Sequence, residues 1–99
     1  MAWNDLPALE RHLTEALNSF DWETARKTVG EVIIRMRTEP DPIPPLTVCR
    51  MLRRLRRKRQ FVPIQQLAEE VISSGRATGE VQRQYAQALI GSNEFLFVD

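Results

Sequence analysis

The segment PIQQLAEEVISSG, Pro63 to Gly75, decides the fold class of this 99-residue chain. Its apolar residues recur at intervals of three and four, the spacing that places side chains on one face of an α-helix. Polar residues fill the positions between them, and Gly75 is a typical residue after a helix end. The segment is therefore predicted to be an amphipathic helix with the apolar stripe Ile64, Leu67, Ala68, Val71 and Ile72.

The same period continues through the rest of the chain. Asp5 and Asp21 are expected to cap the first two helices, and Pro44 and Pro45 are expected in the first turn of the third. A strand is indicated only by FLFV, residues 95–98, which is short. The chain is predicted to be all-α, with about five helices.

Length and composition describe one small domain. With 99 residues, the chain has room for a single modest core. Its apolar runs are shorter than the roughly 18 residues that a membrane span needs, and the first residues do not form a secretory signal. Cys49 is the single cysteine, which excludes an internal disulfide and favours a reducing compartment. We expect a cytoplasmic protein that does not bind membranes.

Residue patterns for catalysis or metal binding are missing. His12 is the single histidine and has no companions at metal-ligand spacing. Neither a glycine-rich phosphate loop nor a nucleophile–histidine–acid order stands out. Cys49 lies on the apolar stripe of its helix and is expected to be a core thiol. We expect no catalytic residues, no metal and no cofactor.

The charge is concentrated in one helix. The segment CRMLRRLRRKRQF, Cys49 to Phe61, holds seven basic residues and no acidic one, whereas residues 1–42 and 61–99 each carry a net charge of −3. Four arginines recur at helical spacing and form one face, the arginine stripe: Arg50, Arg53, Arg54 and Arg57.

Three interpretations of the arginine stripe remain open. The first is a solvated face that pairs with acids of neighbouring helices, such as Glu31, Glu69 and Glu70. The second is a surface for an acidic protein partner. The third, nucleic-acid binding, is less favoured because no stacking aromatics are interleaved with the arginines.

Aromatic residues mark an internal repeat. Trp22, Phe61 and Phe95 follow successive odd-numbered helices at similar spacings along the chain. Apolar residues recur at the same offsets after the first two anchors: Ala25 and Val29, then Ile64 and Ala68. This period predicts stacked αα-hairpins, with Trp22 largely buried as the anchor of the first and Gly30 allowing close helix packing.

These features resemble the tetratricopeptide repeat family, whose unit of about 34 residues is a pair of antiparallel helices. The segment GEVQRQYAQALIGSNEF, residues 79–95, matches best: Tyr85-Ala86 stands at the large-then-small pair and Phe95 at the following aromatic. The other units depart from the pattern, since Leu52 and Ile64 stand where the family prefers smaller residues. QYAQAL is also similar to arrays near the N-terminus of larger bacterial signalling proteins.

The resemblance implies one helical-repeat domain over residues 1–99, a right-handed stack of hairpins. The hairpins would cover about residues 5–38 and 44–74, with an incomplete third unit at about 78–99. Such a module is implied to be a scaffold that binds a peptide or helix along its concave side, with the arginine stripe selecting acidic groups. The alternatives are a basic nucleic-acid-binding domain and a self-assembling helical adaptor.

The end of the chain suggests self-association. The third unit stops before its second helix, and terminal repeats normally present a polar outer face. We therefore expect an assembly surface here, covered by another copy or by further chain, that consists of Tyr85, Leu89, Phe95 and Phe97.

Overall fold

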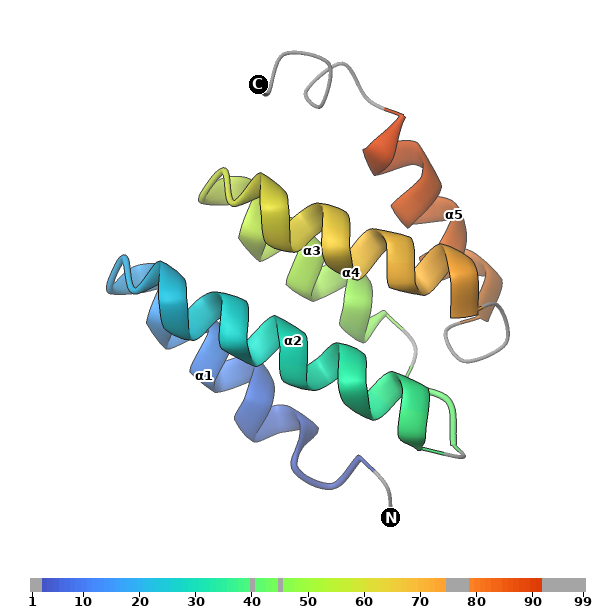
Figure 1. The fold of residues 1–99 in the computed structure, drawn as a ribbon, viewed down its shortest axis with the longest axis horizontal. Coiled ribbons are helices and arrows are strands. Elements are labelled where there is room, and N and C mark those ends of the chain that lie inside the picture. Colours follow the sequence, from blue (N-terminus) through green and yellow to red (C-terminus); the bar gives the residue numbers. More distant parts are fainter. Residues whose placement is uncertain (1–2, 40, 45, 75–78, 92–99) are drawn as a thin grey trace.

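The structure, a computed structural model, describes residues 3–39, 41–44, 46–74 and 79–91 (Figure 1). These residues form five α-helices and no strand: α1 (Leu6–Asn18), α2 (Trp22–Thr38), α3 (Thr47–Arg57), α4 (Phe61–Ser74) and α5 (Gly79–Ile90). The all-α prediction is confirmed, and the strand predicted at 95–98 lies outside the described residues.

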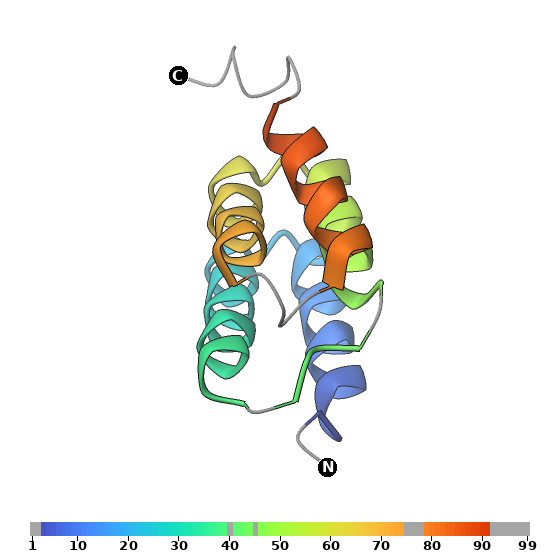
Figure 2. The ribbon, with the colours of Figure 1, turned by 90° about the vertical axis from the view of Figure 1, so that its right-hand side faces the viewer.

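The helices lie in two layers. Figure 2 shows α1, α3 and α5 in one layer and α2 and α4 in the other. Consecutive helices α1–α2, α3–α4 and α4–α5 contact each other, and contacts within the layers join α1 to α3, α3 to α5 and α2 to α4. Alternate helices of the chain therefore lie in the same layer.

The core fills the space between the layers. Apolar stripes from all five helices meet there, and matching positions of the first two hairpins are buried. Leu13 and Leu52, which are separated by the same interval as Trp22 and Phe61, are both fully buried. The same holds, or nearly so, for other pairs at that interval: Leu9 and Val48, Ala16 and Leu55, Ala25 and Ile64, Val29 and Ala68, and Val32 and Val71.

The turns of these two hairpins repeat the same backbone geometry. Phe20 and Arg59, which are equivalent positions of the two hairpins, adopt left-handed conformations with φ of 59° and 55°. The N–H of the following residue then donates to the carbonyl five positions earlier, Asp21 to Ala16 at 2.8 Å and Gln60 to Leu55 at 3.0 Å. This pattern is a Schellman motif, which ends α1 and α3 in the same way.

The starts of α2 and α4 differ for a reason visible in the sequence. Asp21 caps α2 as predicted, because its carboxylate accepts the N–H of Thr24 at 3.2 Å. The residue of α4 that is equivalent to Thr24 is Pro63, which has no N–H to donate. A capping side chain at Gln60 would therefore lack its usual third-position donor.

Two predicted helix starts need correction. Asp5 precedes α1, but its side chain makes no capping hydrogen bond and instead pairs with Arg35 of α2. The start predicted at Pro44 and Pro45 is wrong, since α3 begins at Thr47. Leu46 there adopts a left-handed conformation with φ of 68°, which interrupts any helix that began earlier.

Two packing predictions are also corrected. Trp22 is half-buried instead of largely buried, because it begins α2 at the turn end and its ring meets that of Phe20 edge-on at 5.7 Å. Gly30 was expected to allow close helix packing. A Cβ at this position would meet no atom of another helix within 4 Å, so that prediction is wrong.

Candidate functional site

A groove runs between α1 and α3 on the layer that they share with α5. It contains a cavity of about 460 Å³ and a second of about 230 Å³ that lies nearer the hairpin turns. We name it the α1–α3 groove. It is lined by Pro7, Glu10, Arg11, Thr14, Leu17 and Asn18 on the α1 side and by Arg50, Arg54, Arg57 and Lys58 on the α3 side.

The helical period of α3 places the arginine stripe on the side of the helix that faces away from the core. Val48, Leu52 and Leu55 on the opposite side of the helix are fully buried in the core. The arginine stripe must then face outward, and three of its members are exposed while Arg54 is half-buried. The predicted stripe is thus a real face of α3, yet its members have different neighbours.

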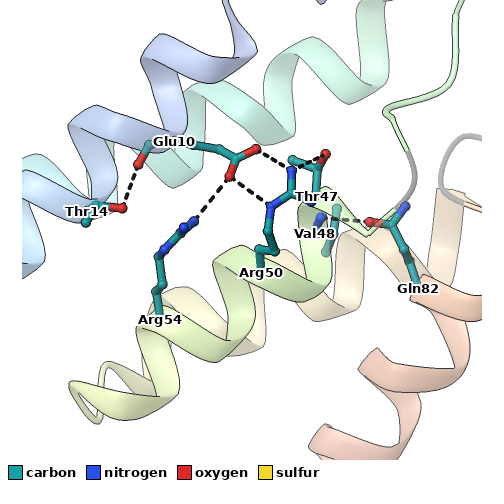
Figure 3. Close-up of polar contacts among 7 residues, drawn as sticks. All are labelled: Glu10, Thr14, Thr47, Val48, Arg50, Arg54 and Gln82. Carbon is teal, nitrogen blue, oxygen red and sulfur yellow. Dashed lines mark hydrogen bonds and ion pairs between the residues drawn. The ribbon is translucent and has the colours of Figure 1, made fainter.

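Glu10 of α1 holds two of these arginines (Figure 3). The Arg50 guanidinium donates to both carboxylate oxygens, with Nη2–Oε1 at 2.8 Å and Nε–Oε2 at 3.2 Å. Arg54 Nη1 donates to Oε2 at 3.1 Å. The Glu10 side chain is 16% exposed, so this carboxylate lies inside the groove between the two guanidinium groups.

The electrostatics of this contact favour the ionised acid. Burial by itself raises the pKa of Glu10, but hydrogen bonds from Arg50 and Arg54 and their charges outweigh burial. The pKa of Glu10 consequently lies below its usual value. The hydrogen bond to Glu10 likewise raises the pKa of Arg50.

The acids predicted to neutralise the arginine stripe are not the ones that do so. Glu31, Glu69 and Glu70 lie on α2 and α4, in the other layer. Glu70 accepts hydrogen bonds from Arg37 at 2.7 and 2.9 Å instead. Sequence reasoning missed Glu10. The signal that would have found it is the repeat itself, which places α1 beside α3.

The other two members of the arginine stripe, Arg53 and Arg57, do not contact Glu10. The Arg53 guanidinium lies over the Tyr85 ring of α5, 5.6 Å from its centroid. Arg57 lines the smaller cavity, and it forms no ion pair within the described ranges. Next to it, Lys58 Nζ lies 5.3 Å from the centroid of the exposed Phe20 ring.

The predicted assembly surface is only partly described. Tyr85 is half-buried beneath Arg53, and Leu89 is 5% exposed within the core. Leu89 is therefore covered by this chain itself, which corrects its assignment to an outer surface. Phe95 and Phe97 lie outside the described residues, so their part in assembly stays a prediction.

Cys49 is a core residue. Burial raises the pKa of its thiol, an effect that outweighs the charges of Arg53 and Arg50. A thiol with a raised pKa is a poor nucleophile at neutral pH. Among the described residues, no three or more His, Cys, Asp or Glu side chains are grouped to hold a metal ion. None of the described helices has both the length and the apolar character to cross a membrane.

Comparisons with family models, curated proteins and solved structures find no match to this chain.

Proposed function

We propose that this chain is a non-catalytic protein-interaction module whose α1–α3 groove binds an acidic peptide or helix of a partner protein. The observation that carries the proposal is the way in which Arg50 and Arg54 hold Glu10. Two guanidinium groups already take one carboxylate by hydrogen bonds of 2.8–3.2 Å. Their geometry suits recognition of acidic groups, since arginine binds carboxylates as a planar fork.

The positive charge extends beyond this pair. Arg57 and Lys58 continue the groove toward the hairpin turns, and Arg53 lies on the side of α5. Because Glu10 supplies a single negative charge against these several cations, most of the positive charge is available to a ligand. A ligand with several acidic groups is therefore the complement of this surface.

The repeated hairpin supports a scaffold role. Two hairpins share turn geometry and buried positions at one constant spacing, and α1, α3 and α5 share a layer. We infer that they form a short right-handed stack similar to tetratricopeptide repeats, which bind ligands along an extended inner surface. We place this scaffold in the cytoplasm.

The test uses a fluorescently labelled peptide of six glutamates and measures its affinity by anisotropy. The variant Arg57→Gln/Lys58→Gln removes two cations that line the groove. It is chosen because Arg50 and Arg54 hold the partly buried Glu10, and their loss would leave its charge unpaired. Loss of two charge-assisted contacts is expected to lower the affinity by about tenfold or more. The control Arg26→Gln/Lys27→Gln removes equal charge from exposed positions of α2 and should bind like the wild type.

Equal affinity of both double variants would overturn the proposal.

A second arm uses a pull-down from native lysate, with and without nuclease, to separate protein partners from nucleic acid. Retention of an acidic protein after nuclease treatment supports the proposal. Retention that is lost with nuclease would favour nucleic-acid binding instead.

A further inference from the structure

Phe20 occupies a position that neither the turn nor the core explains. Its φ of 59° is a left-handed conformation, which is unfavourable for a bulky residue and suits glycine or asparagine. Arg59 completes the equivalent turn of the second hairpin with the same hydrogen bonds, so the turn does not need an aromatic ring. Phe20 is also 67% exposed and contributes little to the core.

The ring is nevertheless held in place. Its edge-on contact with Trp22, at an interplanar angle of 82°, fixes it from the side of α2. Lys58 Nζ approaches it from the second hairpin. Lys58 also lines the smaller cavity together with Arg57 and Leu17, so Phe20 lies at the turn end of the α1–α3 groove.

We propose that the turn end of the groove is an aromatic–cation subsite for an acidic peptide that carries an aromatic side chain beside its acidic residues. This inference rests on the proposed function, because it specifies the ligand of the same groove. The ligand's carboxylate meets Arg57, which has no ion pair in the described parts of the chain. The neighbouring aromatic side chain packs on Phe20 and on the methylene stem of Lys58.

The composition of this end favours such a mixed ligand over a purely acidic one. An exposed aromatic ring gains little from a carboxylate but buries apolar area against another ring. A purely apolar ligand would instead desolvate Arg57 and Lys58 without compensation. A ligand with acidic and aromatic groups at adjacent positions can pair with the cations and pack on the Phe20 ring at the same time.

The experiment compares two labelled peptides that carry the same six carboxylate side chains: hexaglutamate, and the same peptide with a phenylalanine inserted after the third glutamate. Each is titrated by anisotropy against the wild type, Phe20→Ser and the control Ile34→Ser. Ile34 is similarly exposed but lies on α2. The wild type should bind the aromatic peptide about three- to tenfold more tightly than hexaglutamate, as expected for one aromatic pair.

Phe20→Ser should remove this preference and leave hexaglutamate affinity unchanged, while Ile34→Ser keeps the preference. Thermal melting of each variant checks that the fold is intact. Equal affinities of the two peptides for the wild type, or a preference that survives Phe20→Ser, would overturn the subsite but leave the groove. Failure of both peptides to bind the wild type would overturn the proposed function as well.

Discussion

The side-chain oxygen of Gln82 in α5 lies 2.7 Å from the backbone nitrogen of Val48 and accepts its N–H inside the core. Val48 is the second residue of α3, where backbone N–H groups have no partner within the helix. Leu46, the residue before α3, has no polar side chain that could cap it. Gln82 therefore supplies from another helix the acceptor that a local cap normally provides (Figure 3).

Replacement of Gln82 by methionine should lower the free energy of unfolding by about 1–3 kcal/mol, because the volume is nearly kept but the buried Val48 N–H loses its acceptor. Chemical denaturation measures the change, with Gln87→Met on an exposed face of α5 as the matched control. Equal stability of the two variants would contradict this role of Gln82.

Glu10→Gln should have opposite effects on stability and on binding. It weakens the contact between α1 and α3 and should lower the free energy of unfolding by about 0.5–1 kcal/mol, because both arginines are partly exposed. It also releases Arg50 and Arg54 for a ligand, so hexaglutamate affinity should rise. Denaturation and anisotropy measure the two effects, with Glu15→Gln as a control of equal charge on the same helix.

The stability cost of Glu10→Gln should depend on pH. The folded-state pKa of Glu10 lies below its usual value of 4.5, so the contact stabilises the fold fully above that value. As the pH falls through the lowered folded-state pKa, protonation removes the contribution. The difference in unfolding free energy between wild type and variant should therefore shrink in acid. A difference that stays constant down to the acid transition would show that the charge of Glu10 is irrelevant.

Gly30→Ala should stabilise the chain by up to about 1 kcal/mol, because alanine has the higher helix propensity inside α2 and the added Cβ meets no atom of another helix within 4 Å. That gain corresponds to a melting temperature higher by about 4–8 °C. Thermal unfolding followed by circular dichroism measures it. A lower melting temperature would mean that the helices pack more closely here than the structure shows.

Much of this fold could be predicted because it follows local rules. The helical period identified the helices, and the cap at Asp21 depends only on residues within one turn. The start of α3 was missed because a left-handed Leu46 goes against its intrinsic preference. Gln82 and Glu10 were missed because each acts on another helix, at sequence separations of 34 and 40 residues.

Trp22→Ala tests the equivalence of the two hairpins. Replacing a fully buried tryptophan by alanine lowers the free energy of unfolding by about 3–5 kcal/mol. Because Trp22 is half-buried, the expected loss is about 1.5–2.5 kcal/mol. Phe61 is half-buried at the same position of α4, so Phe61→Ala should show a similar loss. Denaturation of the two variants measures both. An unchanged stability of either one would contradict the shared role.

The most direct test of the proposed function follows the arginine side chains while an acidic peptide is added. In an NMR titration with hexaglutamate, the Nε–Hε signals of Arg54 and Arg57 should shift progressively, because both line the α1–α3 groove. The signals of Arg26 and Arg37 on α2 should stay in place. Equal shifts at all four arginines, or shifts confined to α2, would contradict a specific acidic-ligand site in this groove.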